Sequence, residues 1–89
     1  MESIDLVTKI RRLRKVLEFS QENLGMELQI TQYAYSKIEN GRTRLTFDHL
    51  KGIAKCFGCS VGELVDLPLN ELIGLIGTRT PRPGSTSKG

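Results

Sequence analysis

The chain has 89 residues, an apolar share of 38% and a formal net charge of +3. That length allows one small domain. Its core supplies only marginal stability unless its helices pack well or two chains associate. No stretch approaches the roughly 18 consecutive apolar residues of a membrane span, and the start of the chain lacks the basic and apolar regions of a signal peptide. We therefore expect a cytoplasmic protein.

The charge is unevenly distributed along the chain. Residues 1–60 contain ten Lys/Arg and seven Asp/Glu, a net of +3, whereas residues 61–77 contain three acids and no Lys or Arg, a net of −3. Residues 78–89 contain three bases and no acid, again +3. A surface for a polyanion is therefore expected in the first two thirds of the chain, with help from the basic tail.

The first predicted helix covers about residues 4–18. Apolar side chains recur there at helical spacing, namely Leu6, Ile10, Leu13 and Leu17. The other face is predicted to be basic and solvated, and carries Lys9, Arg11, Arg12 and Lys15.

A second helix is predicted from Ser20 to about Leu28. The Ser20 hydroxyl can accept a hydrogen bond from the N–H groups that a helix start leaves without a partner. Gly25 inside this helix costs roughly 1 kcal/mol in helix propensity relative to Ala. A close helix–helix contact at that position would explain why a glycine is there.

A turn of three residues, 29–31, leads into a third predicted helix at about residues 32–39. Ile30 is expected to fill the angle between the two helices, and Thr31 to cap the third. Asn40-Gly41 ends it, since Gly accommodates a left-handed backbone. Two short helices joined in this way have the spacing of a helix-turn-helix, whose second helix can enter a DNA major groove.

Two further helices are predicted, the fourth capped by Thr46 and the fifth by Ser60 and ended by Pro68. The apolar stripe of the fourth is predicted to lie in the core: Phe47, Leu50, Ile53, Ala54 and Phe57. No segment alternates like a strand. We therefore expect an all-α, compact five-helix bundle in residues 1–67.

Residues 68–77 form an apolar segment after these five helices have already made a core. We expect a dimerisation element here, because monomers rarely expose such a patch, with the candidates Leu69, Leu72, Ile73 and Ile76. The alternative is that the segment folds back onto the core of its own chain. Residues 78–89 are rich in Pro, Gly and Ser, contain no hydrophobic residue, and are predicted to be a disordered basic tail.

Several of these features occur together in one known family. They are Ser20-Gln21 at a helix start, Leu24 before a small residue, Ile30 in the turn, Tyr35-Ser-Lys-Ile-Glu-Asn-Gly41, and Ala54-Lys-Cys-Phe-Gly-Cys-Ser60. Over residues 6–67 the chain resembles the phage-repressor-like (Cro-type, or xenobiotic-response-element) helix-turn-helix regulators. The resemblance implies a five-helix bundle whose third helix reads DNA, and homodimers on two-fold symmetric operators.

The resemblance also indicates which residues contact double-stranded DNA. The candidates for base contact are Gln32, Tyr33, Ser36 and Lys37. Gln32 leads, since its amide can pair with both N6 and N7 of adenine. The candidates for phosphate contact are Gln21, Thr31, Asn40, Arg42 and Arg44, with a solvated loop as the alternative for Arg42 and Arg44. Finally, the family pairs an arginine of the first helix with the glutamate that closes the third, which implies a structural salt bridge between Arg14 and Glu39.

The sequence gives little support to catalysis. It contains one histidine, His49, and neither a metal-ligand cluster nor a glycine-rich phosphate loop after a strand. We expect no enzyme and no cofactor, and interpret Cys56 and Cys59 as reduced thiols, with a metal- or redox-responsive switch as the alternative. The predicted function is a sequence-specific, double-stranded-DNA-binding transcriptional regulator, a repressor that acts as a homodimer on a palindromic operator through the helix at residues 32–39. The alternative is a protein-interaction module that uses the same fold, such as an antitoxin that binds a toxin partner.

Overall fold

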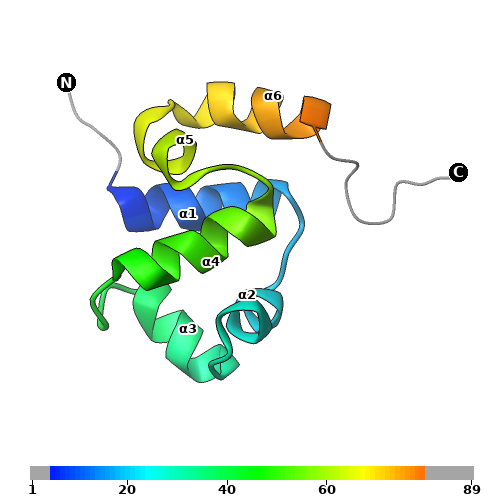
Figure 1. Cartoon of the computed structure of the whole chain (residues 1–89). Helices are drawn as coiled ribbons and strands as arrows, with labels where there is room; N and C mark the ends of the chain where they lie inside the picture. Colours follow the sequence, from blue (N-terminus) through cyan, green and yellow to red (C-terminus); the bar gives the residue numbers. More distant parts are fainter. Residues whose placement is uncertain (1–4, 80–89) are drawn as a thin grey trace, which may run out of the picture.

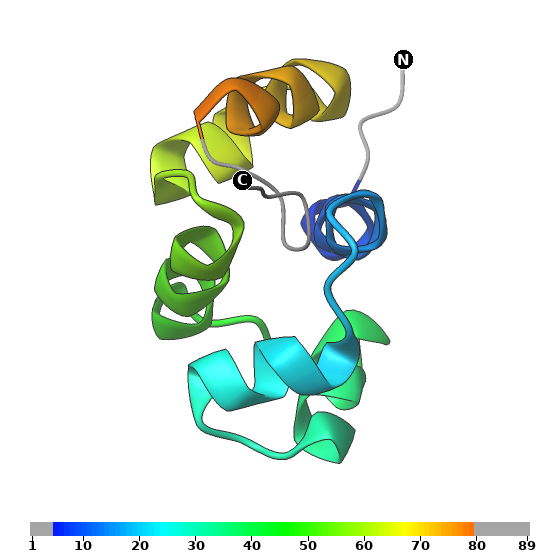
Figure 2. The same cartoon turned by 90° about the vertical axis from the view of Figure 1, so that its right-hand side faces the viewer.

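The computed structural model describes residues 5–79, in which all the regular secondary structure is α-helix. The helices in chain order are α1 (Leu6–Val16), α2 (Gln21–Leu28), α3 (Gln32–Glu39), α4 (Phe47–Phe57), α5 (Val61–Asp66) and α6 (Leu69–Arg79). Figure 1 shows α2 and α3 at one end of the molecule and α5 and α6 at the other, with α1 and α4 between them. In Figure 2 the same two middle helices lie on opposite sides of the molecule. The predicted all-α class is confirmed.

Four of the helices begin at a hydroxyl side chain. Ser20, Thr31, Thr46 and Ser60 each accept a hydrogen bond from the backbone N–H three residues later, at 3.0–3.1 Å. In α2, α4 and α5 the side chain at that later position accepts the N–H of the capping residue in return. These caps satisfy N–H groups that a helix start otherwise leaves without a partner. The helix starts predicted from these four residues are confirmed.

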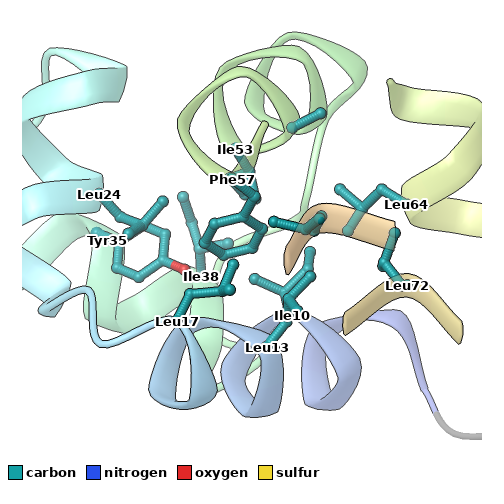
Figure 3. Packing of buried hydrophobic residues seen from close by; sticks show 12 residues of the cluster. Ile10, Leu13, Leu17, Leu24, Tyr35, Ile38, Ile53, Phe57, Leu64 and Leu72 are labelled. Atoms are coloured by element: carbon teal, nitrogen blue, oxygen red, sulfur yellow. The ribbon is translucent and has the colours of Figure 1, made fainter. Parts of the chain in front are cut away.

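One hydrophobic core joins all six helices, as Figure 3 shows for its central part. Its buried members are Ile10, Leu13, Leu17, Leu24, Tyr35, Ile38, Ile53, Ala54, Phe57, Leu64, Leu72 and Ile76. Since helices this short are marginal by themselves in water, burial of their apolar faces in this shared core is what holds them.

Two side chains lie elsewhere than predicted. Phe47 is not in the core: it is the first residue of α4 and is 62% exposed, with the Lys51 ammonium 5.6 Å from its ring centroid. Lys9 is not on the solvated face of α1: it is only 7% exposed, and its Nζ donates to the backbone oxygen of Val65 at 3.3 Å. The reason for the second difference is that the C-terminal part of the chain covers this part of α1.

The apolar segment after Pro68 forms α6, which packs on α1. Leu72 and Ile76 are 0% and 3% exposed and belong to the core of their own chain. This corrects their assignment to a dimer surface, because a side chain buried in this way cannot contact a second copy. Leu69 and Ile73 are half-buried at the edge of the core.

The last residue of α6 forms an ion pair with a residue of α5. Arg79 donates from Nη1 and Nη2 to the two carboxylate oxygens of Glu63, both at 2.8 Å. The hydrogen bonds from Arg79, with that from Ser60, hold the pKa of Glu63 at about 2. Because the helix includes Thr78 and Arg79, the predicted disordered tail is wrong for these two residues. Its remainder, residues 80–89, lies outside the described part.

Candidate nucleic-acid interface

The turn between α2 and α3 is folded tightly against α2. Gln29 has a left-handed backbone with φ of +62°, and the N–H of Ile30 donates to the Gly25 oxygen at 2.8 Å. A Cβ placed on Gly25 would lie 2.9 Å from the backbone oxygen of Ile30. The close contact that Gly25 was expected to permit therefore exists, although it is with the backbone of the turn and not with a second helix. It fixes the angle at which α3 leaves α2.

The Glu39 carboxylate is the point at which α1, α2 and α3 meet. Arg14 donates to it twice, from Nε to Oε2 at 2.7 Å and from Nη2 to Oε1 at 3.1 Å. The Tyr35 hydroxyl donates to Oε2 at 2.7 Å, and Nε2 of Gln21 donates to Oε1 at 3.2 Å. Arg14 also donates from Nη1 to the backbone oxygen of Phe19 at 2.9 Å. The expected Arg14–Glu39 pair is thus part of a larger network.

Burial and hydrogen bonding act on this carboxylate in opposite directions. Glu39 is 2% exposed, and burial alone would raise its pKa. The hydrogen bonds from Arg14, Tyr35 and Gln21 outweigh burial, so the pKa of Glu39 lies below its usual value of 4.5. Burial, together with the hydrogen bond to the carboxylate, raises the pKa of Tyr35. At neutral pH the network therefore consists of an ionised carboxylate, a guanidinium and a neutral phenol.

The face of α3 away from this network remains open to solvent. Gln32 is exposed, Tyr33 is 73% exposed, and Ser36 and Lys37 are partly exposed. The Lys37 ammonium lies 5.2 Å from the centroid of the Tyr33 ring, within the range of a cation–π contact. The structure thus brings the four candidates for base contact together on one accessible surface of the helix.

The candidates for phosphate contact lie around α3 and differ in how accessible their polar groups are. Thr31, Asn40, Arg42 and Arg44 are exposed, and within residues 5–79 neither guanidinium forms an ion pair. Gln21 differs, because it is half-buried and its amide already donates to Glu39. Its side chain is therefore turned partly inward, while the N-terminus of α2 stays at the surface.

Sequence reasoning missed two members of the Glu39 network. The sequence shows Tyr35 only as part of the family motif, whereas in the structure its ring lies in the core and its hydroxyl donates to Glu39. Its spacing of four residues from Glu39 on one helix is the signal that could have shown the contact. Gln21 was considered only as a phosphate ligand, and no local pattern connects it with a residue eighteen positions later.

The two cysteines lie at the edge of the core. Cys56 and Cys59 form no disulfide, and both are half-buried against hydrophobic side chains. Burial raises the pKa of the Cys56 thiol to about 11 and also raises that of Cys59. Thiols in such surroundings are poor nucleophiles at neutral pH. In the described part of the chain, no three His, Cys, Asp or Glu side chains gather where they could hold a metal ion.

A helix-turn-helix family model matches residues 10–64, more than half of the chain. The chain belongs to the Cro/C1-type helix-turn-helix family. The resemblance found from the motifs is thereby confirmed, and the chain carries a DNA-binding helix-turn-helix domain of a kind found in transcriptional regulators. The matched residues include Arg14, Glu39 and the turn between α2 and α3, but not α6.

The other comparisons add no relative. Neither a curated protein nor a solved structure matches the chain significantly. Across residues 5–79, no helix is both long and apolar enough to cross a membrane.

Proposed function

We propose that this protein is a sequence-specific transcriptional repressor that binds a palindromic operator as a homodimer, with α3 in the major groove. The observation that carries the proposal is the pairing of two features on α3. Its outer face is open, while its inner face is fixed to α1 and α2 through the buried Glu39 carboxylate. A reading helix must keep its orientation when it docks, and this network supplies that rigidity.

The outer face of α3 has the chemistry that base reading needs. The Gln32 amide can pair with adenine through N6 and N7, and Lys37 can donate to guanine O6 or N7 or to a phosphate. The exposed ring of Tyr33 offers an apolar surface to a thymine methyl group. Ser36 is short and would reach a base only where the helix sits deepest in the groove.

Phosphate contacts would hold the helix in register. Arg42 and Arg44 follow α3 directly and have no ion-pair partner in the described residues, so their charge is available to DNA. Thr31 and Asn40 at the two ends of α3 add polar groups, and the N-terminus of α2 adds N–H donors. Such contacts position a protein without reading sequence and make its affinity depend on salt.

Two copies are proposed because one helix reads only a few base pairs. A two-fold dimer places two α3 helices on half-sites one helical turn, or a multiple of it, apart and so requires an operator with matching symmetry. Where such an operator overlaps a promoter, the bound dimer would block transcription, and this is the reason for proposing repression.

The proposal is tested by selection from random duplex DNA, followed by sequencing of the bound pool. We expect an enriched motif with two symmetric halves. Absence of any enrichment at low salt, from folded protein, would contradict the proposal and favour a protein-interaction module.

Three variants then separate the roles on the selected site. Gln32→Ala is expected to relax preference at one base pair per half-site, at a cost of about 1–3 kcal/mol. Arg42→Ala is expected to weaken all sequences alike and to reduce the slope of log K against log salt by about 0.9. Arg12→Ala is the matched control, an exposed arginine on α1 at which no change is expected. Equal effects of Gln32→Ala on all sequences would exclude Gln32 as a base-reading residue.

A further inference from the structure

Tyr33 and Lys37 lie one helical turn apart on the open face of α3 and contact each other. The Lys37 ammonium is 5.2 Å from the centroid of the Tyr33 ring. The tyrosine is 73% exposed even so, and the lysine is partly exposed. Within residues 5–79 neither side chain takes part in an ion pair or a side-chain hydrogen bond. Their contact with each other therefore orients the lysine, and most of the ring remains free.

This contact draws the Lys37 ammonium toward the beginning of α3. Tyr33 is the second residue of the helix and Lys37 the sixth, and long side chains on a helix lean toward its N-terminus. The N-terminal residues of a recognition helix are the ones that contact base edges. The charge of Lys37 therefore lies beside the residues at which base reading begins, and not beside Arg42 and Arg44 in the loop that follows the helix.

A lysine held in this way is prepared to bind a base. Its long stem loses conformational freedom when the ammonium docks, and a side chain that is already positioned loses less. At an exposed site, a cation–π contact changes an equilibrium constant by roughly two- to fivefold. An ammonium only donates hydrogen bonds, and guanine is the base whose major-groove edge offers two acceptors, O6 and N7. Guanine is therefore the base that suits Lys37.

The free part of the Tyr33 ring suits a different group. The C5-methyl group of thymine is the apolar feature of a base edge in the major groove, and 5-methylcytosine carries the same group at the same position. Base pairs stack about 3.4 Å apart. Because the ring centroid and the ammonium are 5.2 Å apart, they match neighbouring base pairs better than a single pair.

We propose that Tyr33 and Lys37 read a step of two base pairs as one unit. Tyr33 positions the Lys37 ammonium, which donates to O6 or N7 of a guanine, and the ring packs on the C5-methyl group of the pyrimidine in a neighbouring pair. Thymine and 5-methylcytosine are equivalent for this contact, whereas uracil and cytosine lack the methyl group. The inference rests on the proposed function and deepens it, since it assigns Lys37 to a base and makes affinity respond to cytosine methylation.

The first experiment measures base preference at each position of the selected operator, with the full chain. Lys37→Met removes the ammonium and keeps most of the side-chain volume, and should lower the preference for guanine about tenfold at one position per half-site. Tyr33→Ala should lower the same preference by roughly two- to fivefold, with no further loss when it is combined with Lys37→Met. Tyr33→Phe keeps the ring and should behave like the wild type.

Phe47→Ala is the matched control. It removes another exposed ring with a lysine one turn later, the Lys51 ammonium being 5.6 Å from the ring centroid, but this pair lies on α4. No change in base preference is expected. A Tyr33→Phe variant that loses as much as Tyr33→Ala would show that the hydroxyl acts and would overturn positioning by the ring.

The second experiment replaces the pyrimidine in each of the two base pairs that flank this guanine. Thymine is compared with uracil, and 5-methylcytosine with cytosine, because the members of each comparison differ only in the methyl group. At one flank the wild type should bind the methylated member roughly two- to fourfold more tightly. Tyr33→Ala should bind both members alike.

The outcomes separate this inference from the proposed function. Equal binding of methylated and unmethylated bases at both flanks overturns the methyl contact. If Lys37→Met instead weakens all sequences alike and reduces the slope of log K against log salt, Lys37 binds a phosphate. That result overturns the two-residue unit, while a selected motif still supports the proposed function. If folded protein selects no motif, both proposals fail.

Discussion

Removing Arg14 tests whether the Glu39 network holds the recognition helix in place. In Arg14→Ala the buried carboxylate loses both of its bonds from the guanidinium and retains those from Tyr35 and Gln21. The side chains of Arg14 and Glu39 are 10% and 2% exposed, so water can compensate little of this loss. Breaking a buried ion pair by removing one partner costs about 3–5 kcal/mol.

A loss of this size is large for a domain of 89 residues. Each kcal/mol lowers the melting temperature of such a domain by about 4–8 °C, so Arg14→Ala should melt at least about 12 °C below the wild type. Because a variant so destabilised could fail to fold, Tyr35→Phe provides a milder change. It removes one hydrogen bond to the charged group, which is worth about 1.5–3 kcal/mol. Both variants should also bind DNA more weakly, since each loses a hydrogen bond of the Glu39 network that fixes α3 against α1 and α2.

The pH dependence distinguishes this mechanism from a general loss of packing. In the wild type the pKa of Glu39 is depressed, so its contribution to stability is complete above its usual value of 4.5 and is lost as the pH falls below it. In Arg14→Ala, burial is no longer balanced, and the pKa of Glu39 should rise above 4.5. Protonation then relieves the buried charge, and the variant should gain stability as the pH falls from 7 toward 4.5.

The assay is urea unfolding followed by circular dichroism at several pH values, with Arg12→Ala as the control. Arg12 is an exposed arginine on the same helix, and its removal should change stability by less than about 0.5 kcal/mol. Arg14→Ala with wild-type stability would refute the reasoning. So would a difference from wild type that is the same at pH 4.5 as at neutral pH.

Four further substitutions or labelling experiments test the local geometry. Gln29→Gly should raise the free energy of unfolding by about 1 kcal/mol, because a left-handed backbone is strained for any side chain; an unchanged urea midpoint would argue against this strain. Gly25→Ala should lower it by about 1–3 kcal/mol despite the helix propensity of Ala, since the new methyl group would press on the Ile30 oxygen; a more stable variant would show that the turn can yield. Ser60→Ala should cost about 1 kcal/mol through the lost cap of α5, measurable in the same urea titration. Cys56 should react with a disulfide reagent at pH 8 much more slowly in folded than in unfolded protein, because its pKa is about 11; equal rates would contradict its burial.

Helix starts were predictable because their determinants are local. A capping hydroxyl and the residue three positions later interact within one turn, so Ser20, Thr46 and Ser60 could be identified without knowledge of the rest of the fold. The helix-turn-helix was predictable for the same reason, with the addition of Ile30 and Gly41 at fixed offsets. The side chains that accept the N–H of the capping residue in return, such as His49 in α4, follow from the same spacing.

Other features depend on which element lies opposite, and periodicity does not contain that information. The helical stripe correctly grouped Ile53 and Phe57, but it could not show that Phe47 would be exposed at the start of α4. The charge of Lys9 predicts a solvated side chain, although its spacing of three residues from Leu6 and four from Leu13 places it beside the apolar stripe of α1. The chain after α4 covers this position and buries it. The role of Leu72 was misjudged for the same reason, since a sequence pattern shows that a segment must be covered and not what covers it. The DNA contacts remain predictions until they are tested.

The inclusion of α6 in the core has a consequence for genetics and for protein engineering. The family match ends at residue 64, yet two of the buried core side chains, Leu72 and Ile76, come after it. A stop codon or frameshift shortly after Leu67 would preserve every candidate DNA contact and still remove two buried core side chains, Leu72 and Ile76, together with the helix that packs on α1. Such alleles should behave as null mutations through loss of folding and rapid proteolysis, not as dominant DNA-binding fragments. A transplant of this DNA-binding unit into a fusion protein should accordingly extend through Arg79.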